Sequence, residues 1–282
     1  MLASARASKQ NREMNQPDLR LCRSLLFLPA SNPRAIEKAR GLAADMVVLD
    51  LEDAVKPQDK DSAREAAIEA VSHPFPGLTA IRINAGEPWH EADLAAVADS
   101  AVQLLVYPLT GRPEDIGRVA DRTGKPVMAM IETARGVINA AAIAVESAAL
   151  IAGTNDLSAD LGLRPGHARP VLTTALQMTI LAARAAGIAA FDGVYNRLDD
   201  PEGLEAECRE GRSFGFDGKS LIHPNQIETA NRRFGPSADE VEAAKRLIEA
   251  ATGGAERYEG EMIESMHVAQ ARFVLARARH AF

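Results

Sequence analysis

Short apolar runs alternate with longer segments of helical periodicity along most of the chain. Near-continuous apolar runs that alternate with helices are typical of parallel strands whose outer face is covered. Eight of these units, in the roughly 250 residues that such a fold needs, predict an α/β fold, a TIM (β/α)8 barrel. A doubly wound open sheet is the alternative, but the spacing is even and the first turn is not rich in glycine. The predicted strands are 23–29, 45–52, 78–84, 102–109, 126–133, 149–155, 188–195 and 218–224.

The two ends of the chain lie outside this repeat. Residues 1–20 are polar and basic without an apolar centre, which predicts a disordered leader and not a secretory signal. Residues 21–236 hold the predicted barrel. Residues 237–282 are predicted to form a C-terminal helix followed by a tail that acts as a lid or in oligomerisation.

Local signals set the expected limits of that extra helix. Ser237 is a plausible N-cap, and Glu240 three residues later completes a capping box. Gly253 and Gly254 are expected to end the helix. The remaining residues are expected to begin irregular and to end helical.

Composition narrows the classes of function. The formal net charge is −7 and no basic run is present, which argues against binding of nucleic acid. No apolar stretch approaches the roughly 20 residues that cross a bilayer, so no membrane association is expected. Cys22 and Cys208 lie far apart without metal-ligand spacing, which indicates a reducing compartment and no zinc site. The predicted location is the cytoplasm, with the mitochondrial matrix as the alternative.

Ionisable side chains stand at the ends of most predicted strands. In a (β/α)8 barrel the C-terminal strand ends and the loops that follow them carry the chemistry. The side chains at these ends are Asp50, Glu52 and Asp53 on strand two, Arg82 on strand three, Glu132 on strand five, Asp156 on strand six, Asp192 on strand seven and His223 on strand eight.

Carboxylates that share one mouth repel each other, and a divalent cation would remove the repulsion. Glu132 and Asp156 follow strands that should be adjacent, so their oxygens could share one ion. Ligation by oxygen alone suits Mg²⁺, with Mn²⁺ as the alternative. Glu52 and Asp53 would then hold metal-bound waters. Each carboxylate could instead be structural, and helix capping is the specific alternative for Asp156.

Arg82 lies inside an apolar strand, and a buried arginine needs an anionic partner. That partner is either Glu52 or Asp53, or an oxygen of a substrate. His223 precedes a proline and is expected to be structural, and Asp192 could cap the loop before the next helix.

The lysines argue against one kind of covalent chemistry. A Schiff-base aldolase needs a lysine that points into the barrel. Lys125 and Lys219 fall at strand starts and Lys56 lies on a loop, which favours metal-assisted chemistry over imine chemistry.

The first strand–helix turn offers a candidate anion site. Asn32 is expected at the N-cap and Pro33 at the first helical position, where free N–H groups and the helix dipole favour phosphate. Arg34 and Lys38 add positive charge one turn apart, although surface basic residues on capped helices are common.

Several motifs in series resemble the citrate lyase β-subunit-like family, which belongs with malyl-CoA and citramalyl-CoA lyases in the HpcH/HpaI aldolase group. The resemblance runs from Arg23 to the C-terminus. The motifs are RSLLFLPASNPRAIEKA, VVLDLEDAVKPQDKDSAR, AIRIN, MIETARGVINA, AGTNDLSADLG and GFDGKSLIHPNQIETANRRFGPS.

The resemblance implies a TIM barrel that uses Mg²⁺ in reversible C–C cleavage of a β-hydroxyacyl thioester. On the motif match, Glu132 and Asp156 would be the metal ligands and Arg82 would bind substrate. Glu52 and Asp53 would be the acidic pair near the metal-bound waters.

The first turn is similar to part of the CoA site of the family, which assigns CoA recognition to Ser31, Asn32, Arg34 and Lys38. CoA would enter as part of the substrate. Members of the group are usually trimers or hexamers, and the resemblance implies that the C-terminal segment closes the site of a neighbouring subunit.

Two positions depart from the family pattern. Many relatives have Leu-Pro-Lys after strand four, where this chain has Tyr107, Pro108 and Leu109. Relatives also have an aspartate in the tail motif, where Glu264 follows Met262-Ile263. Glu264 keeps the carboxylate on a side chain longer by one methylene, and it is predicted to be the acid/base.

The leading hypothesis is therefore a Mg²⁺-dependent lyase that cleaves a citramalyl-CoA or malyl-CoA type substrate to acetyl-CoA and a 2-oxo acid. A citrate lyase β-subunit is the first alternative, and it would need an α-subunit and an acyl-carrier protein. The others are a class II pyruvate aldolase for free 4-hydroxy-2-oxo acids and a non-catalytic paralogue that binds thioesters.

Overall fold

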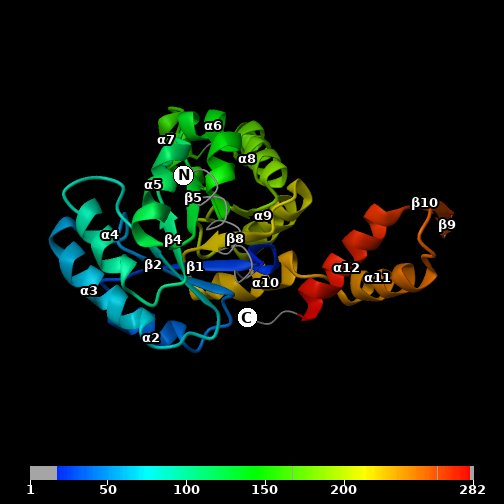
Figure 1. Ribbon diagram of the computed structural model, residues 1–282, viewed down its shortest axis with the longest axis horizontal. Coiled ribbons are helices and arrows are strands. Elements are labelled where there is room, and N and C mark those ends of the chain that lie inside the picture. The colour runs from blue at the N-terminus through cyan, green and yellow to red at the C-terminus, as the bar shows by residue number, and fades with distance from the viewer. Residues whose placement is uncertain (1–17, 167, 259, 280–282) are drawn as a thin grey trace.

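The structure is a computed structural model that describes residues 18–166, 168–258 and 260–279. Eight parallel strands form a closed barrel in chain order, and β8 pairs with β1 to close it (Figure 1). All eight predicted strands are present, each shorter than expected by one to four residues. They are β1 (Ser24–Pro29), β2 (Met46–Asp50), β3 (Leu78–Arg82), β4 (Leu104–Tyr107), β5 (Val127–Ile131), β6 (Ala149–Ala152), β7 (Ala189–Asp192) and β8 (Gly218–Leu221).

Helices cover the outside of the barrel, and two of them, α7 and α8, lie between β6 and β7. Asn32 caps α2 by accepting a hydrogen bond from the Ala35 N–H, as predicted. The helices are α2 (Pro33–Ala39), α3 (Lys60–Val71), α4 (His90–Ala98), α5 (Pro113–Thr123), α6 (Ala134–Glu146), α7 (Thr154–Asp160), α8 (Thr173–Ala186), α9 (Pro201–Phe214) and α10 (Ile227–Phe234), with 3₁₀ turns η1 (Leu19–Leu21), η2 (Pro57–Asp59), η3 (Arg169–Leu172) and η4 (Pro224–Gln226).

Successive residues of each strand point to opposite faces, so the core divides into two parts. On β2, Met46 and Val48 belong to the cluster inside the barrel, whereas Val47 and Leu49 belong to the cluster between strands and helices. Leu19 of η1 joins the inner cluster, which places residues 18–20 with the barrel and not with a leader. The predicted disorder of the preceding residues falls outside the described part of the chain.

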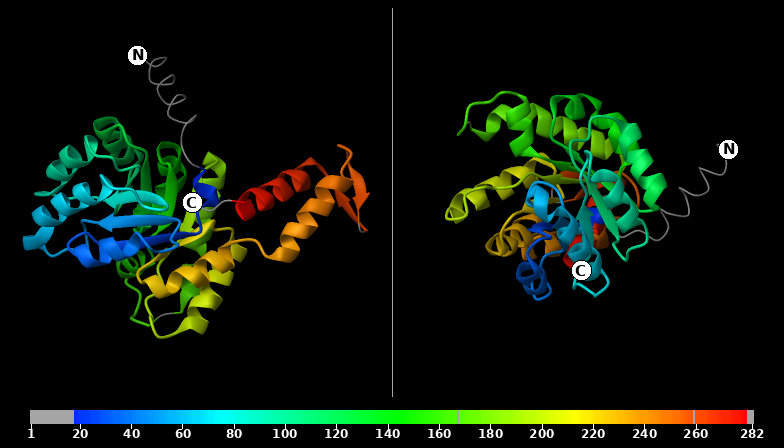
Figure 2. Two further views of the ribbon diagram at one scale, coloured as in Figure 1. Left: turned by 90° about the horizontal axis from the view of Figure 1, so that it is seen from below. Right: turned by 90° about the vertical axis from the view of Figure 1, so that its left-hand side faces the viewer.

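An arm projects from the side of the barrel (Figures 1 and 2). It consists of two packed helices joined at the tip by a two-stranded hairpin. The return end is fixed to the barrel because Arg277 donates hydrogen bonds to the carbonyls of Arg20, Asp217 and Phe234. The elements are α11 (Ala238–Ala250), β9 (Glu256–Tyr258), β10 (Glu261–Ile263) and α12 (Ser265–Arg279).

The local predictions for the arm are confirmed in part. Ser237 and Glu240 form the predicted capping box. The helix ends at Ala250 and not at Gly253, because Ala251 already has an extended backbone. The segment expected to be irregular contains the hairpin. Within the described residues, no helix has the length and apolar character needed to cross a membrane.

Candidate active site

A cavity of about 320 Å³ opens at the C-terminal ends of the strands. Its charged lining consists of Asp50, Asp53, Arg82, Glu132 and Asp156. The structure therefore brings together the two predicted metal ligands, the predicted substrate arginine and one member of the predicted acidic pair.

Strand alternation explains why these side chains meet. Met128 and Met130 on β5 face the barrel interior, and Glu132 continues that face just beyond the strand end. Asp50 and Arg82 continue the inner faces of β2 and β3 in the same way, and they are direct partners in the register of the two strands.

Arg82 is held in place mainly by Asp50. Its Nε and Nη2 each donate to one Asp50 carboxylate oxygen at 2.6 Å. Its Nη1 lies 2.8 Å from Glu52 Oε2 and 3.5 Å from Asp53 Oδ2. Burial opposes the charge of Arg82, but these carboxylates outweigh it and raise its pKa. Glu52 and Asp53 were the predicted protein partners of Arg82. Asp50 was missed, although it lies directly opposite Arg82 when the ends of strands two and three are aligned.

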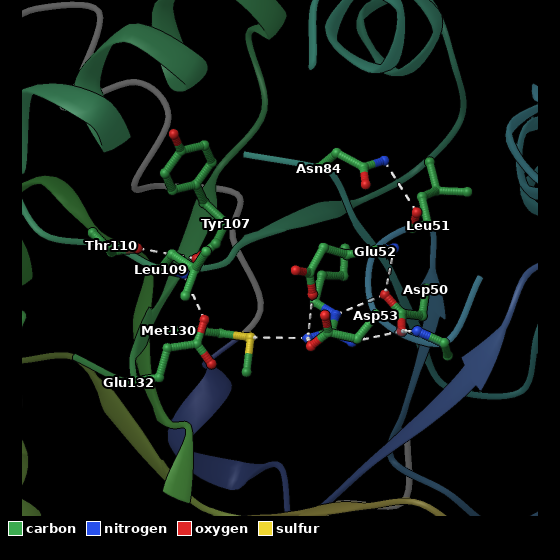
Figure 3. Close-up of polar contacts among 12 residues, drawn as sticks. Asp50, Leu51, Glu52, Asp53, Asn84, Tyr107, Leu109, Thr110, Met130 and Glu132 are labelled. Carbon is green, nitrogen blue, oxygen red and sulfur yellow. Dashed lines mark hydrogen bonds and ion pairs between the residues drawn. The ribbon is translucent and has the colours of Figure 1, made fainter. Parts of the chain in front are cut away.

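Glu132 is buried, and only one of its two carboxylate oxygens has a hydrogen-bond partner among the described residues. Its Oε1 accepts a hydrogen bond from the Leu109 N–H at 2.5 Å, whereas its Oε2 has no hydrogen-bond partner in the described part of the chain (Figure 3). Burial raises the pKa of Glu132 to about 8; the Leu109 N–H opposes this rise and the charge of Asp156 adds to it. A carboxylate in this state has one oxygen left for a cation.

Leu109 contributes its backbone to this arrangement. Its φ of 49° lies in the left-handed region that side chains other than glycine rarely adopt. This conformation accompanies the turn after β4 that directs the Leu109 N–H at Glu132. The exposed side chain of Leu109 is not needed for that contact.

The neighbouring carboxylates also resist ionisation. Burial raises the pKa of Glu52 to about 7, against the effect of Arg82 and with the help of Asp53. Burial and the charge of Asp53 raise the pKa of Asp156. Asp156 is not a helix cap, because Gly153 occupies the N-cap of α7 and Asp156 lies inside the first turn. The capping alternative for Asp156 is therefore wrong.

These residues suit a divalent cation. Among the described residues, no group of three or more His, Cys, Asp or Glu side chains is arranged to hold a metal. Mg²⁺ does not require one, since it keeps several waters and binds through one or two carboxylates. Glu132 and Asp156 supply two, and the unpartnered Oε2 of Glu132 is a free ligand atom.

The raised pKa of Glu132 predicts a pH dependence of stability in metal-free buffer. Unfolding restores the ordinary pKa of 4.5, so the folded state holds the proton more tightly. The stabilisation is complete below pH 4.5 and is lost as the pH rises through about 8. The free energy of unfolding should fall over this window in chemical denaturation with EDTA. Glu132→Gln should flatten the fall; an identical slope in this variant would contradict the assignment.

Gly153 provides the space that Glu132 occupies. A Cβ at this position would collide with the carboxylate of Glu132. Gly153→Ala should therefore displace Glu132 and lower the free energy of unfolding by about 1–3 kcal/mol, as overpacking does. Gly117→Ala on α5 is a matched control, because the added Cβ meets only ordinary contact there. Equal denaturation midpoints for both variants would contradict this role of Gly153.

Asp192 does not line the cavity at the barrel mouth, contrary to the prediction from its place at a strand end. Phe191 faces the barrel interior, so Asp192 faces outward toward α9. It is fully buried and accepts hydrogen bonds from Arg169 at 2.8 Å and Lys219 at 3.0 Å. The Lys219 ammonium also contacts Glu207 at 2.7 Å. Asp192 and Lys219 thus form a buried ion-pair network between the barrel and its helices.

Other predicted site residues lie away from the cavity. Glu264 directly follows β10, which lies at the tip of the arm remote from the barrel (Figure 1). His223 caps η4 by accepting a hydrogen bond from the Asn225 N–H and does not line the cavity. The residues predicted to recognise CoA are exposed on α2 and just before it, after the strand whose Phe27–Pro29 line the cavity; they are Ser31, Asn32, Arg34 and Lys38.

Comparison with known proteins agrees with this geometry. The sequence matches the HpcH/HpaI aldolase/citrate lyase family over residues 23–224. It is 43% identical to a (3S)-malyl-CoA thioesterase of Cereibacter sphaeroides, over 91% of this chain and 94% of that protein. It is 34% identical to the citrate lyase subunit beta of Leuconostoc mesenteroides subsp. cremoris, over 93% of this chain and 95% of that protein.

A crystal structure of protein CitE from Mycobacterium tuberculosis, in complex with magnesium, acetoacetate and coenzyme A, superposes with a TM-score of 0.79. That chain is 34% identical, and the match covers 93% of this chain and all of the other. The barrel fold is thus shared with a protein whose crystal structure holds magnesium, acetoacetate and coenzyme A. The chain belongs to the HpcH/HpaI aldolase/citrate lyase family of enzymes.

Proposed function

We propose that the chain is a Mg²⁺-dependent enzyme that cleaves a β-hydroxyacyl-CoA of the malyl-CoA or citramalyl-CoA type. The observation that carries this proposal is the pairing of Glu132 and Asp156 in one cavity, with an unpartnered Glu132 oxygen, beside the Arg82 guanidinium. The magnesium and coenzyme A in the related CitE structure support it.

Glu132 and Asp156 would hold the ion, with Mn²⁺ as the alternative metal, and Glu52 and Asp53 would orient its waters. Bound Mg²⁺ would polarise the oxygens of a hydroxy-carboxylate as a Lewis acid. Arg82, fixed by Asp50, would stabilise the oxygen charge that develops during the reaction.

C–C cleavage is the reaction we place first. The substrate hydroxyl would lose its proton to a base, and the bond between the hydroxyl-bearing carbon and the carbon next to the thioester would break. The first fragment leaves as a 2-oxo acid. The second is an acetyl-CoA enolate, which must gain a proton on carbon, and we assign that transfer to Glu264.

Glu264 could act in this way only from a second copy of the chain, because the arm holds it away from its own barrel (Figure 1). The side chains of Met262 and Met266 beside it are 68% and 58% exposed, and Leu109 at the barrel mouth is 51% exposed. Docking of an arm tip over a neighbour's mouth would cover these apolar groups. We therefore propose a homotrimer or hexamer with shared sites.

Mixing two inactive variants tests the sharing of sites. In the first variant, Glu132→Gln removes the ion site from every subunit. In the second variant, Glu264→Gln removes the proton donor from every subunit. Hybrid oligomers should regain part of the activity, because some sites then combine an intact barrel with an intact arm. A mixture that exchanges subunits but stays inactive would contradict the arrangement.

CoA recognition is proposed along α2. Arg34 in its first turn and Lys38 in its last turn are exposed, and neither forms an ion pair with another described residue. They are available to phosphate groups of a CoA moiety whose acyl end enters the cavity past Phe27–Pro29.

Thioester hydrolysis is a second candidate, favoured by the 43% identity with a (3S)-malyl-CoA thioesterase. In that case water would attack the thioester carbonyl, and free CoA and the hydroxy-acid would be the products. The same ion and Arg82 would bind the substrate.

The products decide between the two reactions. Purified protein is incubated with malyl-CoA or citramalyl-CoA, with Mg²⁺ or with EDTA. C–C cleavage yields equal amounts of acetyl-CoA and glyoxylate or pyruvate, whereas hydrolysis yields free thiol without oxo acid. We expect Mg²⁺-dependent oxo acid. Free thiol alone would establish the second candidate, and no product from either substrate would contradict the proposed function.

A further inference from the structure

A buried lysine beside the active site neither lines the active-site cavity nor forms an ion pair with another described residue. Lys60, the first residue of α3, is 6% exposed. It has no carboxylate partner within ion-pair distance among the described residues. A buried ammonium without such a partner must be compensated by hydrogen bonds.

All three donors of the Lys60 ammonium are used, two of them on the loop that carries Glu52 and the third on Asn84. Its Nζ donates to the carbonyls of Leu51 at 2.9 Å and Glu52 at 3.0 Å, and to Asn84 Oδ1 at 2.5 Å. Asn84, itself buried, donates through its Nδ2 to the same Leu51 carbonyl at 3.0 Å (Figure 3). Lys60 and Asn84 therefore clamp this loop through its carbonyl groups.

The opposite side of the loop is held by Asp50. The N–H groups of Glu52 and Ala54 donate to the Asp50 carboxylate at 2.9 and 3.1 Å. With its carbonyls bound by Lys60 and its N–H groups bound by Asp50, the backbone that carries Glu52 and Asp53 is held from both sides in this conformation. That conformation places both carboxylates against Arg82 at the cavity.

We propose that Lys60 is a positioning residue that fixes the Leu51–Asp53 loop so that Glu52 and Asp53 face the ion held by Glu132 and Asp156. This inference rests on the proposed function. A loss of this contact should act on the ion site through the loop, since partners that orient a metal site typically contribute about 10–100-fold in affinity or activity.

The chain carries a reporter for this contact. Trp89 is its single tryptophan, and the Lys60 ammonium lies 4.9 Å from the centroid of the ring. Both residues line a groove of about 330 Å³ next to the active-site cavity. Removal of the ammonium changes the field at the indole, so the emission of Trp89 should shift.

Lys60→Met tests the proposal, because methionine keeps much of the apolar stem and removes the donors. Lys56→Met is the matched control: it makes the same change on an exposed residue four positions earlier. Mg²⁺ affinity is measured by calorimetry, and turnover is measured per folded molecule. We expect about 10–100-fold weaker Mg²⁺ binding or slower turnover for Lys60→Met, with a shifted Trp89 emission, and no change for Lys56→Met.

If Lys60→Met retained the Mg²⁺ affinity and turnover of Lys56→Met, Lys60 would be structural only and the proposal would be overturned. An unchanged Trp89 emission would overturn the contact itself. Should Lys60→Met fail to fold, Lys60→Gln, which keeps a donor on a shorter stem, carries the same test. Mg²⁺ affinity needs no substrate, so failure of the proposed reaction would leave this test intact.

Discussion

Glu132→Gln should abolish Mg²⁺ binding and lower turnover by about 10³-fold or more, because a Lewis acid supplies several kcal/mol of transition-state stabilisation and each 1.36 kcal/mol is a factor of ten. The amide oxygen of glutamine can still accept the hydrogen bond from the Leu109 N–H. The variant also lacks a buried carboxyl whose pKa burial raises to about 8, so it should fold at least as stably as the wild type in metal-free buffer.

Calorimetric titration with Mg²⁺ and the oxo-acid assay check this result. Glu146→Gln at the exposed end of α6 is the matched control and should behave as the wild type. If Glu132→Gln kept Mg²⁺-dependent turnover near that of Glu146→Gln, the assignment of Glu132 as a ligand would be wrong.

Asp192→Ala should have the opposite effect: it should lower the free energy of unfolding strongly and change turnover little. The variant leaves Lys219 and Arg169 buried with an incomplete set of partners. Breaking a buried ion pair from one side typically lowers the free energy of unfolding by about 3–5 kcal/mol. For a chain of this size, such a loss lowers the melting temperature on the order of 10 °C.

The folded fraction of Asp192→Ala should keep the wild-type turnover and Mg²⁺ affinity, because Asp192 faces α9 and not the cavity. Glu91→Ala, which breaks the exposed pair with Arg122, is the control and should leave the melting temperature unchanged. If Asp192→Ala lost Mg²⁺ binding at unchanged stability, Asp192 would belong to the active site and its assignment to the outer ion-pair network would be wrong.

The periodicity of the sequence was sufficient to predict the barrel, because most strands are near-continuous apolar runs that alternate with helical segments. The adjacency of Glu132 and Asp156 followed from the order of the strands. Asp192 was misplaced because position at a strand end was considered without the alternation of faces. Phe191 and Asp192 are neighbours, so only one of them can face the interior, and the phenylalanine does.

Other features of the site depend on contacts that no local pattern contains. The Leu109 N–H reaches Glu132 through a left-handed turn at a residue other than glycine. Gly153 is required because the side chain of Glu132 packs against its backbone from the adjacent strand. Lys60 reaches the carbonyl groups of the loop after β2 from the next helix. Each of these contacts joins segments whose distance is set by the closed barrel.

The position of the ion is the central claim, and a crystal grown with Mn²⁺ tests it most directly. The anomalous difference map should show one strong peak bonded to Glu132 Oε2 and to the Asp156 carboxylate, about 2.0–2.2 Å from each oxygen, within the range of hard-cation coordination distances. A fully occupied peak elsewhere in the barrel, or no peak at a Mn²⁺ concentration that supports turnover, would contradict the account.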